Sequence, residues 1–184
     1  MYCDTINVAQ KKKRLCIRPE TPGDYEAIGR INEAAFGGNA ESRLVERLRR
    51  TEAFLPELSL VAELEGVPVG YTLFYPVRIR SDVRSFPTLA LAPMAVLPEC
   101  QNKKIGSTLA IAGLRYAQEG GHRSVIVLGH PPFYHRFAFK TASEWGIRAP
   151  FDVPDESFMA LELVLGELEG KAGVVEYPAE FHDP

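Results

Sequence analysis

The longest organised pattern in the chain covers residues 88–128, where two apolar runs flank an amphipathic segment. Residues 88–97 and 124–128 are nearly continuous in apolar side chains, which is typical of parallel strands covered on both faces. Between them, apolar residues recur at spacings of four, three and four, a pattern that predicts a helix with one buried stripe: Ile105, Leu109, Ala112 and Tyr116. Parallel strands need a crossover, so these residues predict a βαβ unit.

Shorter patterns on either side predict the remaining elements. They indicate a strand at residues 15–19, helices at 25–35 and 41–50, a hairpin at 58–79, a short helix at 133–137 and a last strand at 158–164. Residues 1–14 are predicted to be a flexible leader, and residues 15–184 a single domain. Residues 166–184 are expected to wrap around the surface.

Composition and charge narrow the range of partners. Of the 184 residues, 46% are hydrophobic and the net charge is −3, which argues against a general nucleic-acid or membrane-surface role and favours a small partner. We expect a cytoplasmic protein without a membrane span. Its cysteines, Cys3, Cys16 and Cys100, show no metal-binding spacing, so we expect reduced thiols and no bound metal.

The turn into the predicted helix, at residues 98–107, has the character of an anion site. A helix start exposes unpaired N–H groups and carries roughly half a positive charge. Gly106 allows close backbone approach, and Lys103 and Lys104 add two charges. A phosphate or pyrophosphate would suit this turn, although basic turns without a ligand are equally common. The P-loop and dinucleotide fingerprints are both missing.

Pro93 interrupts the strand that precedes this turn. Because proline cannot donate a ladder hydrogen bond, we expect the sheet to bulge there. Backbone groups of Met94, Ala95 and Val96 would then be available to pair with an extended ligand. The alternative is an edge bulge that binds nothing.

Two segments carry a resemblance to a known family. Residues 94–109 resemble the acetyl-CoA signature of the GNAT N-acetyltransferases, Q/R-x-x-G-x-G/A, with Gln101 and Gly106 matching its ends and Lys104 replacing its first glycine. Residues 134–139 are similar to the family's Y-x-x-x-G-F, with Ala138 in the glycine position. Residues 151–181 resemble the tail of a poorly characterised bacterial branch of the family.

The resemblance implies an α/β (α+β) fold, with a mixed, twisted central sheet of about six to seven strands flanked by helices. It implies that the βαβ unit binds acetyl-CoA, whose acetyl group passes to a primary amine by direct attack on the thioester. Tyr134 matches the position of the general acid, which donates to the leaving sulfur, and it would also contact the coenzyme. The other implied coenzyme contacts are Met94, Ala95, Val96, Gln101, Asn102, Lys103, Lys104, Ile105, Gly106 and Ser107.

Other roles stay open at this level. An amide of Met94 or Val96 is a candidate for stabilising the oxyanion. His130 is a candidate base because its usual pKa is about 6.5 and it ends a strand, but a capping or surface histidine is the alternative. Further candidate bases are Glu33, Glu41 and Glu63. The acceptor is a small-molecule or peptide amine, and a homodimer is possible. Residues 36–41 are implied to line the acceptor pocket, and a flexible turn between two helices is the alternative.

Two other functions fit the same residues. A non-catalytic acyl-CoA-binding or regulatory module on the same fold would explain why Lys104 and Ala138 replace glycines. An unrelated protein that binds a phosphate-containing ligand would explain the basic turn but not the Tyr134 segment. Tyr134 therefore favours the enzyme.

Overall fold

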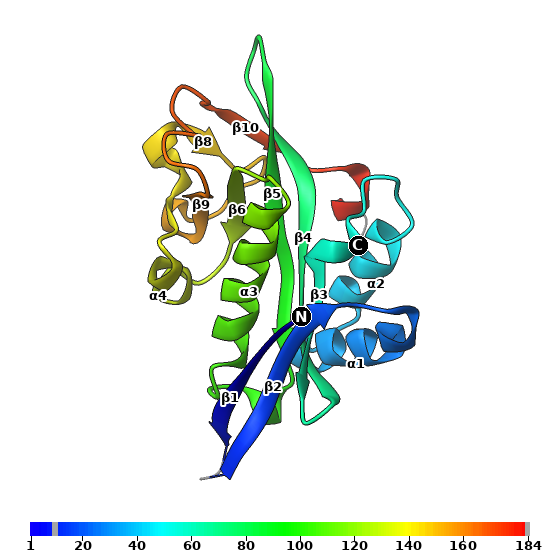
Figure 1. The fold of residues 1–184 in the computed structure, drawn as a ribbon. Helices are drawn as coiled ribbons and strands as arrows, with labels where there is room; N and C mark the ends of the chain where they lie inside the picture. The colour runs from blue at the N-terminus through cyan, green and yellow to red at the C-terminus, as the bar shows by residue number, and fades with distance from the viewer. Residues whose placement is uncertain (9–10, 183–184) are drawn as a thin grey trace. The chain divides into compact units, whose positions relative to one another are not determined.

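The computed structural model describes residues 1–8 and 11–182 (Figure 1). Its strands and helices belong to two compact units. Unit 1 contains residues 1–74 and 93–116, and unit 2 contains residues 75–92 and 117–182. Three long elements contribute residues to both units: β4 (Val67–Arg80), β5 (Ser85–Val96) and α3 (Ile105–Glu119). The number of independently folding domains stays a prediction.

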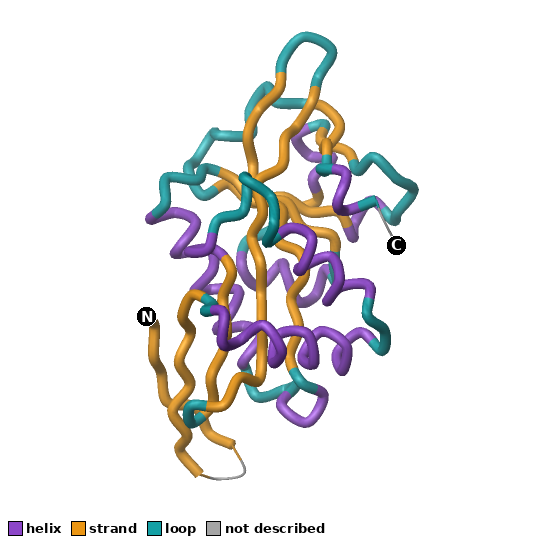
Figure 2. The backbone as a smooth tube through the Cα atoms, turned by 90° about the vertical axis from the view of Figure 1, so that its right-hand side faces the viewer, coloured by secondary structure: helices purple, strands orange, loops and turns teal. Residues whose placement is uncertain are grey.

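Unit 1 begins with strands that pair antiparallel in chain order. They are β1 (Tyr2–Val8), β2 (Lys11–Pro19), β3 (Ser59–Leu64) and the first part of β4. Figure 2 shows the hairpin of β1 and β2 in orange at the N-terminus. Helices α1 (Tyr25–Phe36) and α2 (Ala40–Leu48) follow β2. The Asp24 carboxylate accepts hydrogen bonds from the Thr21 amide and hydroxyl, at 2.7 and 2.8 Å, and so starts the helical segment.

The core of unit 1 confirms the helix predicted from the four-three-four spacing. Ile105, Leu109 and Ala112 are buried on α3 against the sheet, and Tyr116 is partly buried beside them. The strand residues that they meet are Ile6, Leu15, Ile17, Leu60, Ala62, Leu64 and Val69. Burying this apolar stripe, at about 25 cal/mol per Å², is what holds α3 on the sheet.

Unit 2 contains the parallel step of the βαβ unit. Strand β5 pairs in parallel with β6 (Ser124–Leu128), with Leu89 opposite Val125, so the predicted crossover is confirmed. Strand β9 (Phe158–Glu162) pairs antiparallel with β6, and β7 (Lys140–Thr141) pairs with β9. Strand β10 (Gly173–Glu176) pairs antiparallel with β4 and parallel with β8 (Ile147–Arg148). Helix α4 (Pro131–Tyr134) is a single turn.

The structure has more strands than the sequence predicted. Residues 1–8 and 11–182 contain ten strands instead of six to seven, and β7 and β8 are only two residues long. Strand β10 falls in the segment expected to wrap around the surface. The mixed sheet flanked by helices, which the resemblance implied, is confirmed.

The N-terminal segment also differs from the prediction. A flexible leader was expected over residues 1–14, but β1 and the first residues of β2 lie within it, and the two strands pair from Tyr2 opposite Ile17 onward. Ile6 and Tyr2 belong to the core cluster of unit 1, so burial of their apolar surface offsets the cost of ordering the strand. Polar residues stand between Tyr2 and Ile6 in the sequence, so the apolar pattern is too weak to predict a strand.

Two of the three cysteines are oxidised in the structure. Cys3 lies opposite Cys16 in the register of β1 and β2, and the two residues form a disulfide. The expectation of reduced thiols is therefore wrong for this pair, whereas Cys100 is free and buried. Thirteen residues separate Cys3 from Cys16 in sequence, so only the hairpin shows that they meet.

Candidate active site

The loop before α3 has the backbone of an anion site. Asn102 and Lys104 are in the left-handed region, with φ values of 59° and 65°. The Lys104 carbonyl accepts a hydrogen bond from the Thr108 amide at 2.9 Å, which begins the helix. Among the described residues, no group accepts a hydrogen bond from the Ile105 or Gly106 amide. These amides are therefore available to an anion.

The side chains of this loop divide into two groups. Lys103 donates to the Glu99 carbonyl, and Gln101 donates to the Val96 carbonyl at 3.1 Å, so both side chains brace the loop itself. Lys104 is exposed, and its ammonium can therefore meet a ligand. The φ value of Lys104 also explains why the signature of the family has glycine at this position, since the left-handed region favours glycine.

The hairpin of β4 and β5 contains an irregularity of the kind expected from Pro93. At the tip of the β4–β5 hairpin, the Ser81 amide donates to the Arg84 carbonyl, and further along the Leu97 amide donates to the Val69 carbonyl, both at 2.9 Å. Between these bonds β4 advances by twelve residues and β5 by thirteen. An additional residue in one strand is what a β-bulge produces. Past Pro93, Ala95 is buried, whereas Met94 and Val96 are partly buried against the core of unit 1.

Tyr134 is held by close packing in unit 2. Only 7% of the residue is exposed, and its ring makes edge contacts with Phe133 and Phe139, at centroid distances of 5.0 and 5.6 Å. A Cβ atom on Gly129 would lie 2.3 Å from Cε2 of the Tyr134 ring, so only glycine allows this approach. Burial raises the pKa of Tyr134 to about 12, and the phenol stays protonated at neutral pH.

His130 and Ala138 lie before and after Tyr134. His130 precedes α4, and its carbonyl accepts hydrogen bonds from the Phe133 and Tyr134 amides, at 3.0 and 3.3 Å, while its residue is exposed. Ala138 has a φ value of 65° and ends the short helical segment. As at Lys104, the glycine position of the family motif is occupied here by a residue with a left-handed backbone conformation.

The predicted site residues fall into two sets. The loop residues 101–107 and the strand residues Met94, Ala95 and Val96 lie in unit 1, and the hydrogen bond from Gln101 to Val96 joins them. Tyr134 and His130 lie in unit 2, on either end of one helical turn.

The carboxylates suggested as further bases have different surroundings, although all three lie in unit 1. Glu63 pairs with Arg18 at 2.5 Å. Glu33 accepts a hydrogen bond from the Ser42 hydroxyl at 3.1 Å, and Glu41 lies in the first turn of α2. The Glu63 carboxylate is thus already engaged by the guanidinium of Arg18.

A buried polar network in unit 1 was not found from the sequence. Arg49 binds Glu20 through two hydrogen bonds, at 2.7 and 3.0 Å, and its guanidinium lies 3.8 Å from the ring centroid of Tyr25. The Tyr71 hydroxyl lies 2.7 Å from the Ser59 hydroxyl, and burial raises the pKa of Tyr71. These residues come from separate elements, so no local spacing could reveal them.

The described residues offer no cluster of three or more histidine, cysteine or acidic side chains that could hold a metal ion. Among the helices in residues 1–8 and 11–182, none combines the length and apolarity that crossing a membrane requires.

Parallel strands joined by a crossover helix, within a mixed sheet, define this chain as an α/β protein. Comparison with known proteins then identifies the family. The Acetyltransferase (GNAT) family matches residues 25–139, and the chain belongs to that family. The resemblance stated from the two motifs is confirmed.

Relatives and solved structures agree with this assignment. The chain is 32% identical to the uncharacterized N-acetyltransferase YhbS of Escherichia coli, over 91% of this chain and 99% of that protein. It is 36% identical to the uncharacterized N-acetyltransferase YjhQ of Escherichia coli, over 72% of this chain and 74% of that protein. These similarities support the assignment of the whole chain to the family.

Two solved structures share the fold. A crystal structure of Escherichia coli YhbS in complex with CoA has a TM-score of 0.85 and 30% identity, covering 96% of this chain and 97% of that one. A GNAT family acetyltransferase from Brucella melitensis in complex with acetyl-CoA has a TM-score of 0.72 and 31% identity, covering 91% and 97%. Both are therefore structural neighbours with a coenzyme in place.

Proposed function

We propose that this protein is an acetyl-CoA-dependent N-acetyltransferase that transfers the acetyl group to a primary amine by direct attack on the thioester. The single observation that carries the proposal is the pair of unpartnered amides, Ile105 and Gly106, behind a loop in the left-handed conformation. Membership of the GNAT family and the coenzyme-bound neighbours support it.

The residues present fit the coenzyme. The amides that open α3 would receive the pyrophosphate, and exposed Lys104 would add a positive charge beside it. The pantetheine arm would pair with the strand backbone at Met94, Ala95 and Val96, which follow Pro93. Lys103 and Gln101 would contribute by fixing the shape of the loop, because both already bind its backbone.

The chemistry assigned to this chain is proton transfer and charge stabilisation. As the amine nitrogen bonds to the acetyl carbon and the carbon–sulfur bond breaks, Tyr134 donates its phenolic proton to the departing sulfur. A backbone amide of Met94 or Val96 stabilises the oxyanion. His130 or water takes the proton that the amine loses. The high pKa of Tyr134 keeps its proton available at neutral pH.

The proposal includes the setting of the reaction. We place the protein in the cytoplasm, because its proposed cosubstrate is a multiply charged molecule that does not cross membranes unaided. The acceptor is a small-molecule or peptide amine rather than nucleic acid or a membrane, in keeping with the net charge of −3. A homodimer stays a prediction.

Two measurements on the purified chain test the proposal. Acetyl-CoA should raise the melting temperature, because a ligand that binds only the native state stabilises it. Release of free thiol from acetyl-CoA should then depend on the amine in a panel of small amines and peptide N-termini. Absence of a thermal shift at saturating acetyl-CoA would contradict the proposed coenzyme site.

The second candidate is a non-catalytic acyl-CoA-binding module, favoured by Lys104 and Ala138 in glycine positions. Both residues keep the left-handed backbone that glycine would adopt. Their replacement of glycine is therefore compatible with an active enzyme. A thermal shift with acetyl-CoA, combined with no amine-dependent thiol across a broad panel, would establish the module and reject the enzyme.

A further inference from the structure

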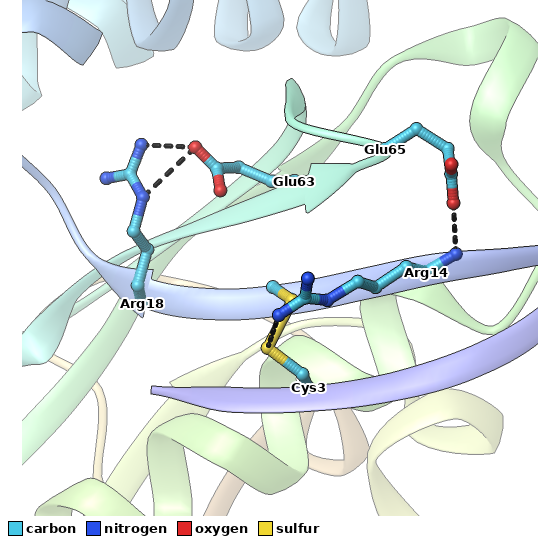
Figure 3. Close-up of a disulfide and its surroundings, with 6 residues drawn as sticks. Cys3, Arg14, Arg18, Glu63 and Glu65 are labelled. Atoms are coloured by element: carbon cyan, nitrogen blue, oxygen red, sulfur yellow. Dashed lines mark hydrogen bonds and ion pairs between the residues drawn. A yellow bond between two sulfur atoms is a disulfide. The ribbon is translucent and has the colours of Figure 1, made fainter.

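We infer that Cys3 and Cys16 form a reversible thiol–disulfide site, which reacts with low-molecular-weight disulfides and controls how firmly β1 holds the first turns of α3. Figure 3 shows this disulfide joining β1 to β2, with Arg14 reaching back to the Cys3 sulfur. The site lies wholly in unit 1, and no step of the proposed acetyl transfer uses it.

The two sulfur atoms differ in how easily a reagent can reach them. Cys3 is exposed, whereas only 7% of Cys16 is accessible. The Arg14 guanidinium lies 3.8 Å from the Cys3 sulfur. A cation at this distance favours the thiolate, which is the form of cysteine that attacks disulfides. Cys3 is therefore the entry point, and Cys16 is the resolving partner.

The surroundings of Cys16 also give access to a small molecule. A cavity of about 310 Å³ opens beside it and contains groups of both charges. This volume is at the small end of the range for ligand pockets in proteins, so it suits a small thiol rather than a protein partner. Its lining residues are Met1, Arg14, Cys16, Glu63, Glu65 and Gly66.

The reaction balances with a small disulfide as oxidant. The Cys3 thiolate attacks one sulfur of that disulfide, which forms a mixed disulfide at Cys3 and releases one small thiol. The Cys16 thiolate then attacks the Cys3 sulfur, which closes the Cys3–Cys16 bond and releases the second thiol. The protein loses two electrons and two protons, and the small disulfide gains them. Excess small thiol reverses both steps.

The consequence for the fold follows from what β1 covers. Ile6 is buried in the same core cluster as Ile105 and Leu109, on the first turns of α3, and the Arg115 guanidinium lies 5.6 Å from the ring centroid of Tyr2. The disulfide adds a covalent tie to an edge strand that is otherwise held by one partner strand. Reduction should therefore loosen β1 and, with it, the apolar cover of the α3 start.

Cys100 provides a matched control, because it lies in the same core cluster but is buried, unpaired and 9% exposed. In the reduced protein, we expect an alkylating reagent to modify Cys3 at least tenfold faster than Cys100. The Arg14→Gln variant should slow alkylation of Cys3 several-fold. Equal rates at Cys3 and Cys100 would overturn the inference.

Equilibration of the full chain in buffers of reduced and oxidised glutathione tests reversibility. We expect Cys3 and Cys16 to be oxidised and reduced together, and mass spectrometry should show the loss of two hydrogens on oxidation. Reduction should lower the melting temperature by about 5–10 °C. Cys3→Ser should melt like the reduced protein in either buffer, whereas Cys100→Ser should keep the full response. Failure to form the disulfide, or an equal response in Cys3→Ser, would overturn the inference.

Hydrogen exchange and coenzyme binding give the final readout. In the wild type, the amides of β1 should exchange faster after reduction, whereas in Cys3→Ser their exchange rates should be the same in both buffers. Unchanged exchange rates in the wild type would overturn the inference. The expectation that reduction also weakens acetyl-CoA binding rests on the proposed function. If acetyl-CoA does not bind in either state, the proposed function fails, while the thiol and exchange results still decide this inference.

Discussion

The loop before α3 and the segment around Tyr134 match the two family motifs in different ways. Each has a non-glycine residue at a left-handed position, Lys104 or Ala138, with the same φ of 65°. The loop offers backbone amides and an exposed lysine, whereas the other segment offers one side chain fixed by packing. A glycine in a family motif can therefore mark a left-handed backbone conformation, which another residue can adopt at a modest energetic cost.

The first prediction removes the hydroxyl of Tyr134 and leaves the packing of its ring unchanged. Tyr134→Phe should lower kcat by about 100-fold, because a positioned general acid contributes at least that much. It should leave acetyl-CoA affinity within about twofold, since the ring still fills the same space. Steady-state kinetics with an active amine, together with calorimetric titration of acetyl-CoA, would measure both quantities.

Tyr177→Phe is the matched control, because Tyr177 is another tyrosine of unit 2 whose pKa is raised by burial. Its kcat should stay near wild type. The pH dependence gives a second check: a phenol stops donating above its pKa, and burial raises the pKa of Tyr134 to about 12. The ratio of wild-type to Tyr134→Phe rates should therefore be constant from pH 7 to 10, and a fall within that range would contradict the assignment.

The second prediction disturbs the packing without touching the phenol. Gly129→Ala would place a Cβ atom 2.3 Å from the Tyr134 ring, so the ring must move. We expect a loss of about 2 kcal/mol in unfolding free energy, with a parallel loss of kcat. Urea unfolding measures the first, and Gly38→Ala is the control because nothing lies within 4 Å of its added Cβ. Equal stability of the two variants would show that the ring is not confined.

The sequence could predict elements whose signal is local. The stripe on α3 and the parallel strands around it follow from periodicity, and the structure confirms them. The left-handed conformation of Lys104 could not be predicted from its residue type, which suits a helix interior. The packing of Gly129 under Tyr134 was equally hidden, because two residues five apart meet there only through the turn into α4.

The N-terminal hairpin shows where local signals fail. The apolar contacts of Ile6 are with residues far along the chain, such as Leu109, so its short polar surroundings predict a leader instead of a strand. The Cys3–Cys16 disulfide depends on that same register. Cysteine spacing alone cannot report it, because 13 residues fit a hairpin and many other arrangements.

The third prediction separates charge from backbone in the loop before α3. Lys104→Ala and Lys104→Gly both remove the ammonium, and each should weaken acetyl-CoA binding by about fivefold, the size expected of one exposed charge beside a phosphate. Raising the salt concentration should reduce this difference from wild type, because salt screens exposed charges. Lys103→Ala is the comparison, and its effect should come through the loop because Lys103 binds the Glu99 carbonyl. If Lys104→Ala binds as tightly as wild type at low salt, Lys104 does not contact the coenzyme.

The fourth prediction concerns Ala138, four residues after Tyr134. Ala138→Gly should relieve left-handed strain of about 1–2 kcal/mol, while the additional freedom of glycine in the unfolded chain costs about 0.4–1 kcal/mol. We therefore expect a net gain of about 0.5 kcal/mol in unfolding free energy, measured by urea denaturation. Because Phe133, Phe139 and Gly129 hold the Tyr134 ring, kcat should not change. A large gain in kcat would mean that Ala138 shifts the Tyr134 phenol from its best position in the wild type. Packing alone would then not determine the position of the phenol.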